Sequence, residues 1–287
     1  MKHIEKALEK AGSAGTEAQK PSKKKLIRES VPMPAAEFDA PQPPASAQSN
    51  QYARRSVSSL PSIDCDFEGF FAKHYGDGTS SDQLRTAYGS LRTAVLQKAA
   101  LKGYRKIGIT SASPNAGKTV TALHLSLACA RREEYDIFLT DFDLRSPSIA
   151  KYISARNFST IAEYFRGDKA FSEFIYRTEE KALQIVLNDT RLDFSAEFLA
   201  GNKADQAIDE MMSMSDNGMY FFDLPPILGC DDTIAFLPKL DALVFVAASD
   251  ETHTSHMRDA MAAIGDFPVL ATVLNKHEGV VSSYQYY

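Results

Sequence analysis

The segment from residue 106 to 119 constrains the fold of this chain more than any other part of its sequence. A short β-prone run over residues 106–110 enters a loop that closes on Gly117, Lys118 and Thr119. An apolar helical pattern follows from about residue 120 to 131. A strand, a loop and a helix in this order predict a phosphate-binding loop, whose backbone N–H groups surround the phosphates of a nucleotide.

The residue types of this loop suit phosphate binding. Lys118 places a cation at the β- and γ-phosphates, the Thr119 hydroxyl is a ligand for Mg²⁺, and Gly117 allows close backbone approach. Ala112 replaces the first glycine of the pattern G-x-x-x-x-G-K-[ST], which is the mildest such change. The alternative is a chance Gly-Lys-Thr, which the flanking strand and helix disfavour. The residues expected to bind the nucleotide here are Ser113, Pro114, Asn115, Ala116, Gly117, Lys118, Thr119 and Val120.

Short apolar runs alternate with helical patterns along the rest of the chain. Strands are predicted over 135–140, 183–187, 219–222, 242–248 and 268–274, and helices over 203–214 and 253–264. Such runs suit strands that are buried on both faces. The sequence therefore predicts an α/β fold that is P-loop NTPase-like, with a mostly parallel sheet flanked by helices on both faces. Ligands of such sheets bind at the C-terminal strand ends, where Lys118, Asp141, Asp143, Asp223 and Asn275 fall.

The chain is expected to have three parts. Residues 1–60 combine a short helix over 1–12 with a linker rich in Pro, Ser and Ala, whose composition predicts disorder. Residues 61–278 form the globular domain, and residues 279–287 form a flexible tail. The tail contains Tyr284, Tyr286 and Tyr287.

A helix is predicted just before the phosphate loop, over residues 81–98, with Asp82 as its N-cap. The sequence Leu-Arg-Thr-Ala occurs in it twice, at 84–87 and 91–94, so that both copies lie on one face. Two explanations of this repeat remain open. The helix is either an amphipathic helix with two solvated arginines or a helix that contacts another subunit.

Composition and charge narrow the class of protein. A net charge of −5 argues against nucleic acid as a partner. No run reaches the ~18 apolar residues of a membrane span, and the first residues lack the apolar core of a secretory signal. The three cysteines are far apart and odd in number, which indicates reduced thiols rather than disulfides. We therefore expect a cytoplasmic location.

Three aspartates, Asp141, Asp143 and Asp223, follow or end predicted strands. Mg²⁺ prefers hard oxygen ligands, and a carboxylate beside a phosphate loop is placed to supply one. One of the three could instead accept a proton from an attacking hydroxyl, and each alone could be a cap or turn residue. Together with the phosphate loop they favour a functional role. His253 and His256, three residues apart, lack a third metal ligand, so a solvated helix face is favoured there.

Three segments carry a family resemblance. Residues 111–119 contain the phosphate loop, residues 138–147 read Phe-Leu-Thr-Asp-Phe-Asp-Leu-Arg-Ser-Pro, and residues 221–226 read Phe-Phe-Asp-Leu-Pro-Pro. In this order they resemble the Walker A, A′ and B motifs of the bacterial tyrosine kinases (BY-kinases) of capsule and exopolysaccharide synthesis. The resemblance covers about residues 80–287. Related partitioning and septum-site ATPases carry an early lysine in the loop, which is missing here between Thr110 and Gly117.

The resemblance implies roles for these residues. Lys118 and Thr119 would bind phosphate and Mg²⁺, and Asp223 would act on the Mg²⁺ shell. Asp141 and Asp143 would position the metal and activate the tyrosine hydroxyl. The segment that ends in Asn275 and Lys276 resembles one that places an Asn near the adenine. The autophosphorylation sites would be Tyr284, Tyr286 and Tyr287.

The implied function is that of an ATP-dependent protein-tyrosine autokinase that regulates capsular or exopolysaccharide synthesis or export, with Mg²⁺ as cofactor. Its partners would be further copies of itself and a separate membrane protein of the chain-length-determinant type. That activator would recruit the kinase to the inner face of the cell membrane.

The chain departs from the family on the helix before the phosphate loop. Family members usually carry Glu-x-x-Arg-x-x-Arg there, which mediates ring assembly, whereas this chain has Thr86, Gly89 and Arg92. This departure keeps an alternative function open. In that alternative the chain is a P-loop ATPase that acts as a nucleotide-dependent assembly switch for a polysaccharide-export partner and phosphorylates no tyrosine.

Overall fold

The computed structural model describes residues 56–75, 79–249 and 251–277. The chain divides into two units, residues 1–50 and 51–287, and every described residue belongs to the second. The predicted N-terminal helix, most of the linker and the tail with its three tyrosines therefore lie outside the described residues. Within the described part, no helix is both long enough and apolar enough to cross a bilayer.

The described residues form a sheet of seven strands in the order β3-β4-β2-β5-β1-β6-β7. All neighbouring strands are parallel except β3, which is antiparallel to β4. The bounds are Lys106–Ser111 (β1), Asp136–Asp141 (β2), Ile175–Arg177 (β3), Leu183–Val186 (β4), Gly218–Asp223 (β5), Ala242–Ala248 (β6) and Val269–Asn275 (β7). The predicted α/β class with a mostly parallel sheet is confirmed.

The strands match the apolar runs from which they were predicted, to within one residue at each end. Strands β5 and β6 are buried at every position, as expected for strands covered on both faces. Among the strands of the described residues, β3 alone was not predicted, because its three residues are too few to show a period. That short strand lies at one edge of the sheet, where the backbone of Ile63 and Pro61 pairs with Arg177.

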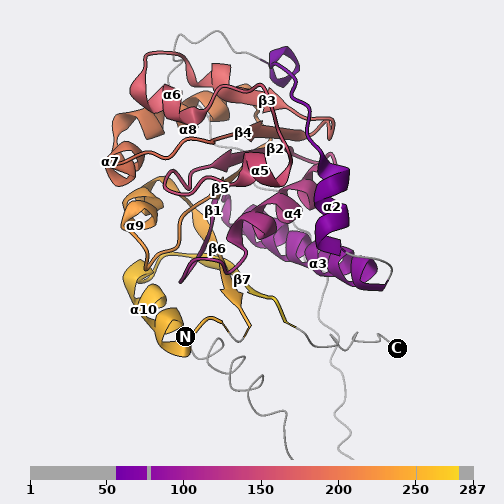
Figure 1. Ribbon diagram of the computed structural model, residues 1–287, viewed down its shortest axis with the longest axis vertical. Helices are drawn as coiled ribbons and strands as arrows, with labels where there is room; N and C mark the ends of the chain where they lie inside the picture. Colours follow the sequence, from indigo (N-terminus) through magenta and orange to yellow (C-terminus); the bar gives the residue numbers. More distant parts are fainter. Residues whose placement is uncertain (1–55, 76–78, 250, 278–287) are drawn as a thin grey trace, which may run out of the picture. The chain divides into compact units, whose positions relative to one another are not determined.

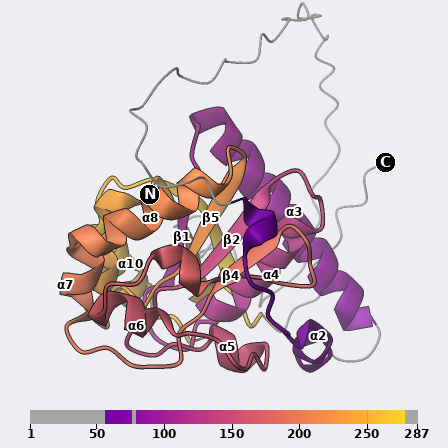
Figure 2. The ribbon, with the colours of Figure 1, turned by 90° about the horizontal axis from the view of Figure 1, so that it is seen from above.

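Helices cover both faces of the sheet (Figure 1). Figure 2 shows α3 and α4 on one side of the strands and α8 and α10 on the other. The longer helices are α2 (Phe67–Tyr75), α3 (Thr79–Lys102), α4 (Lys118–Ala130), α8 (Asn202–Met214) and α10 (Thr254–Ile264). The shorter ones are α5 (Ile149–Tyr152), α6 (Ile161–Arg166), α7 (Ser195–Ala200) and α9 (Asp232–Phe236).

The helix before the phosphate loop is longer than predicted. Helix α3 begins at Thr79 rather than Ser81, so Asp82 lies in its first turn and is not the N-cap. An aspartate in the first turn still stabilises the helix, because its charge faces the positive end of the helix dipole. The sequence signal for a helix start was therefore correct, and only the position was wrong by a few residues.

One face of the core contains an element that the sequence analysis did not predict. Helix α2 and the chain before it contribute Leu60, Ile63, Cys65, Phe67 and Phe70 to the buried interior. Of these, Phe70 packs against His124 of α4, with ring centroids 4.6 Å apart. The spacing of these buried residues fits both the helical period (positions 60, 63, 67 and 70) and the strand period (positions 63, 65 and 67), so the pattern alone does not decide which element they form.

Candidate active site

The phosphate loop lies between β1 and α4, at the C-terminal edge of the sheet. Gly117 caps α4 with φ 90°, in the left-handed region that glycine adopts at little cost. A Cβ on Gly117 would lie 2.0 Å from Nδ2 of Asn275, so this close approach needs glycine. The Asn275 amide donates to the carbonyl of Ala116 at 2.9 Å. The last residue of β7 thus braces the loop that starts α4.

Two of the three aspartates lie side by side because of the register of the sheet. Asp141 ends β2 and Asp223 ends β5, and the two residues pair directly across these parallel strands. Strand β1, which leads into the phosphate loop, is the other neighbour of β5. The fold therefore brings the ends of three strands, far apart in sequence, to one place.

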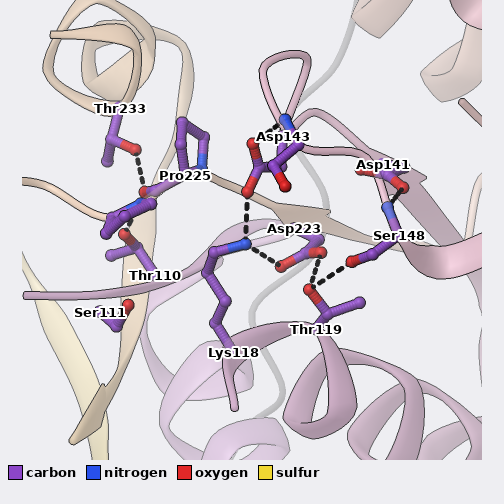
Figure 3. A network of polar contacts seen from close by, with 12 residues as sticks. Thr110, Ser111, Lys118, Thr119, Asp141, Asp143, Ser148, Asp223, Pro225 and Thr233 are labelled. Carbon is purple, nitrogen blue, oxygen red and sulfur yellow. Dashed lines mark hydrogen bonds and ion pairs between the residues drawn. The ribbon is translucent and has the colours of Figure 1, made fainter. Parts of the chain in front are cut away.

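The side chains of the loop and the carboxylates are in contact (Figure 3). Lys118 Nζ lies 2.5 Å from Asp143 Oδ2 and 3.9 Å from Asp223 Oδ1. The Thr119 hydroxyl donates to Asp223 Oδ2 at 2.7 Å. Four of the residues predicted to form the site are thus joined in one network.

Asp141 is held by the backbone that follows it. Its Oδ2 accepts hydrogen bonds from the N–H groups of Ser148 and Ile149, each at 3.0 Å. The hydroxyl of Ser148 donates to the Thr119 hydroxyl at 3.2 Å. Asp141 therefore fixes the start of α5 beside the first turn of α4, and it belongs to the same network as Thr119.

These charged groups are almost completely withdrawn from solvent. Asp141 and Asp223 are 0% exposed, Asp143 3% and Lys118 9%. Burial and then the charge of Asp223 raise the pKa of Asp141 well above its usual value. Burial raises the pKa of Asp223 to about 6, although Lys118 and Thr119 partly oppose the shift. Burial lowers the pKa of Lys118, but Asp223 and Asp143 outweigh it and hold the lysine protonated.

The donor set fits a magnesium ion that is shared with phosphates. Among the described residues, Oδ1 of Asp141 and Oδ1 of Asp223 are buried without a hydrogen-bond partner, which is costly unless a cation is bound. No group of three or more His, Cys, Asp or Glu side chains in the described ranges forms a cage for a metal. Mg²⁺ suits such a site, because it usually takes one or two carboxylates and completes its shell with phosphate and water.

The network opens into a cleft of about 1180 Å³. The strand order places Asn275 at one end of it, Lys118 and Thr119 in the middle, and Arg145 towards the other end. Asp143 lines the cleft, whereas Asp141 and Asp223 lie behind its surface. Of the predicted nucleotide-binding residues, the cleft is lined by Pro114, Asn115, Gly117, Lys118, Thr119, Val120 and Asn275.

Sequence reasoning missed several residues of this region. His256, interpreted as part of a solvated helix face, is exposed, but its Nδ1 lies 3.2 Å from the hydroxyl of Ser113 in the phosphate loop. Arg145 lies within a recognised motif, yet its partner Asp232 had no sequence signal. Ser148 likewise stood out by neither spacing nor charge. These contacts depend on tertiary structure, because their partners are distant in sequence.

Comparisons with known proteins relate the chain to kinases in sequence and in fold. No protein-family profile matches the chain. The tyrosine-protein kinase YwqD of Bacillus subtilis is 26% identical over 211 residues, which is 72% of this chain and 86% of that protein. A putative tyrosine-protein kinase in the cps region of Klebsiella pneumoniae is 26% identical over 143 residues, 50% of this chain but 19% of that protein. The kinase domain of the Escherichia coli tyrosine kinase ETK has the same fold, with a TM-score of 0.64 at 18% identity, covering 76% of this chain and 84% of that one.

Proposed function

Because this chain is related to the bacterial tyrosine kinases in sequence and shares their fold, we propose that it is an ATP-dependent protein-tyrosine kinase. It phosphorylates tyrosines of its own tail in neighbouring copies and so regulates the synthesis or export of a capsular polysaccharide or exopolysaccharide. The polysaccharide role is supported by the relative from the cps region.

One observation carries this proposal: the phosphate-loop lysine is paired with a cleft-lining carboxylate. A P-loop protein needs a lysine and metal-binding oxygen ligands to hold a nucleotide; here Lys118 is the lysine, and the Thr119 hydroxyl and the Asp223 carboxylate supply the oxygens. Asp143 is an additional carboxylate, 2.5 Å from Lys118, at the surface of the cleft. A carboxylate in that place is within reach of a hydroxyl that attacks the γ-phosphate.

The geometry suggests distinct roles for Asp143 and Asp141. Asp143 lines the cleft, and its two oxygens contact Lys118 and the N–H of Ser146. Asp141 lies behind the surface, with one oxygen tied to the backbone of α5. We therefore assign Asp143 as the proton acceptor and place Asp141 with Asp223 and Thr119 in the magnesium shell.

In the proposed phosphoryl transfer, Lys118 acts first and Asp143 second. Lys118 leaves Asp143 for the β- and γ-phosphates of ATP, which frees the Asp143 carboxylate. The tyrosine oxygen forms a bond to the γ-phosphorus as the bond to the β–γ bridging oxygen breaks, and the phenolic proton goes to Asp143. Mg²⁺, when bound, neutralises charge on the phosphates. Catalysis comes mainly from positioning and from charge neutralisation within a buried site.

The acceptors are Tyr284, Tyr286 and Tyr287, and the enzyme acts between copies of the chain. We place it in the cytoplasm, at the inner face of the cell membrane, where a membrane protein of the chain-length-determinant type recruits and activates it. Each phosphorylated tyrosine adds about −1.5 to −2 charges at neutral pH. Repulsion between such tails would disperse an assembly, which links phosphorylation to the assembly state.

The assembly switch without kinase activity is the less supported function. It is favoured by Thr86 and Gly89, which replace charged residues of the ring-forming helix motif. It gives no role to Asp143, because nucleotide-dependent assembly needs no proton acceptor in the cleft. The named relatives are also described as kinases.

The kinase function is tested by replacing the phosphate-loop lysine. The full chain is incubated with Mg-ATP, and phosphotyrosine is measured by mass spectrometry. We expect Lys118→Ala to abolish phosphotyrosine, because the variant loses the cation that holds the transferred phosphate. Tyr→Phe substitution at positions 284, 286 and 287 is expected to remove most of it.

Lys169→Ala is the matched control, because Lys169 is an exposed lysine that pairs with Glu163 away from the cleft. It should leave phosphotyrosine at the wild-type level. Phosphotyrosine that persists in Lys118→Ala would contradict the mechanism. ATP-dependent association of the wild type without any phosphotyrosine would support the assembly switch instead.

A further inference from the structure

Two separate segments form the end of the cleft that lies opposite Asn275. One is the turn after β2, residues 143–146, which carries Asp143 and Arg145. The other is the segment after β5, residues 224–231, which joins Asp223 to α9 and lines the cleft with Pro226, Gly229 and Cys230. For Asp143 to face the phosphates that Lys118 binds, these two segments must keep a fixed distance from each other.

An ion pair joins the two segments. Arg145 Nε and Nη2 each lie 2.9 Å from Oδ1 of Asp232, the first residue of α9. The Asp232 side chain is 0% exposed, and Arg145 is the cation with which it forms an ion pair in the described part of the chain. Asp231 is 3.8 Å from the same guanidinium but is 83% exposed. The pairing with Asp232 is thus the strong one, since solvent screens it least.

On the Arg145 side, the turn transmits this contact directly to Asp143. The N–H of Ser146 donates both to the carbonyl of Asp143, at 3.2 Å, and to its Oδ1, at 2.9 Å. The buried Leu144 anchors the turn on its other side, where its carbonyl accepts from the N–H of Leu192 at 2.8 Å. A shift of Arg145 would therefore rotate the carboxylate of Asp143.

On the Asp232 side, α9 is fastened to the strand that ends in Asp223. The hydroxyls of Thr233 and Thr110 both donate to the carbonyl of Pro225, each at 2.7 Å (Figure 3). Pro225 follows Asp223 by two residues. Asp232 is thus fixed relative to β1 and β5, the two strands that position Lys118 and Asp223.

We propose that Arg145 and Asp232 form a clamp that positions Asp143 for the phosphoryl transfer. The clamp binds neither ATP nor metal itself; it holds the turn after β2 against α9, so that the Asp143 carboxylate stays in line with the acceptor hydroxyl. This proposal rests on the proposed kinase function and adds two positioning residues to it.

The kinetic test uses Asp232→Asn, which keeps the volume of the side chain and removes its charge. In the full chain with Mg-ATP, we expect kcat for phosphotyrosine formation to fall about 10- to 100-fold, because small misplacements of a reacting group have effects of that size. The dissociation constant for ATP should stay within about twofold, because contacts of the phosphate loop are unchanged. Arg145→Lys should behave in the same way, since lysine cannot donate from two nitrogens to one oxygen.

Glu180→Gln is the matched control. Arg131 Nε and Nη2 contact Oε1 of Glu180 at 3.1 and 2.9 Å, the same geometry as in the clamp, but away from the cleft. This variant should leave kcat unchanged.

The double variant Arg145→Gln/Asp232→Asn separates positioning from a merely structural role. Arg145→Gln alone leaves a buried charge without its partner, so it should unfold more readily than the wild type. The double variant removes both charges and should regain most of that stability, yet its kcat should stay low. Recovery of kcat together with stability would overturn the proposal.

Hydrogen exchange tests the clamp without relying on kinase activity. In Asp232→Asn the amide of Ser146 should exchange roughly tenfold faster, because its bonds to Asp143 open more often. The amide of Ile149, which bonds to Asp141, should not change. If Ser146 exchange is unaltered, the clamp does not exist, whatever the activity. If the wild type forms no phosphotyrosine but Ser146 responds as expected, the kinase function fails and the clamp stands.

Discussion

At the scale of residues, the candidate site holds more negative than positive charge. Lys118 is the only cation of the described network around Asp141, Asp143 and Asp223, and all four groups are nearly or fully buried. Burial and mutual repulsion oppose the ionisation of Asp141 and Asp223, which is why their pKa values are raised. A site of this kind is strained without ligands and is relieved when a cation binds, so stability is sacrificed there for function.

Asp141→Asn is therefore expected to stabilise the nucleotide-free protein. The amide removes a buried charge while its oxygen can still accept from Ser148 and Ile149. We expect the Tm of the nucleotide-free protein to rise by at least about 2 °C, since 1 kcal/mol corresponds to about 2–4 °C in a domain of this size. The stabilisation that Mg-ATP gives to the wild type should be largely lost. Differential scanning fluorimetry measures both effects.

The control for that variant is Asp193→Asn, because the side chain of Asp193 is 83% exposed. It should change neither the Tm nor the response to Mg-ATP. A lower Tm for Asp141→Asn without ligand would show that the hydrogen bonds of this carboxylate outweigh the cost of its burial.

At the scale of elements, α3 differs from the ring-forming helix that the family resemblance implies. The surviving Arg92 contacts the carbonyl of Ala128 in α4, at 3.4 Å. The hydroxyl of Thr86 donates a hydrogen bond to the carbonyl of Asp82 in the same helix. Gly89 lies mid-helix, and a Cβ there would meet nothing within 4 Å. In the described part of the chain, the side chains of Arg92 and Thr86 thus contact α4 and α3 itself, whereas Gly89 leaves open space beside the helix.

Gly89→Ala is expected to stabilise the protein by about 0.5–1 kcal/mol, because alanine loses less backbone entropy in a helix than glycine does. Gly103→Ala is the matched control. A Cβ on Gly103 would also meet nothing within 4 Å, but its φ of +69° is strained for alanine, so this variant should be destabilised. Urea unfolding compares the two. A Gly89→Ala variant of lower stability would indicate that this position needs glycine for a contact with another chain.

At the scale of the whole molecule, full or partial burial keeps several weakly acidic groups in their neutral form. Burial raises the pKa of Cys65 and of Cys129 to about 12 and that of Cys230 to about 11. Burial also raises the pKa of the Tyr220 phenol to about 12. Each folded-state pKa lies above its unfolded value. The folded state therefore retains protons that the unfolded state loses as the pH rises.

Stability should consequently fall in alkaline solution. The contribution of these groups is fully present below their unfolded pKa values, near 9 for thiols, and is lost as the pH rises towards 12. Between pH 8 and pH 10.5, the thiols of Cys65 and Cys129 should each lower the free energy of unfolding by about 1–2 kcal/mol. Urea midpoints at the two pH values measure the loss. Cys129→Ala should reduce the difference between them, and a midpoint independent of pH would contradict the argument.

The sequence by itself determined the class of fold and predicted the phosphate loop and the aspartates of the candidate site. The apolar runs located six of the seven strands that the described residues form, because a strand buried on both faces must be apolar along its length. Gly117, Lys118 and Thr119 indicated the phosphate loop, because phosphate binding restricts those residue types within one short segment. The three aspartates were found because they end or follow such strands.

The tertiary structure alone decided which of these groups touch. The parallel register of β2 and β5 places Asp141 against Asp223, and the order of the strands brings both beside Lys118. Asp232, Asn275 and His256 reach the loops of the site across more than 80 residues of sequence. Local propensity and periodicity carry no information about such pairings, because they are fixed by how the strands pack side by side rather than by the residues next to them in the chain.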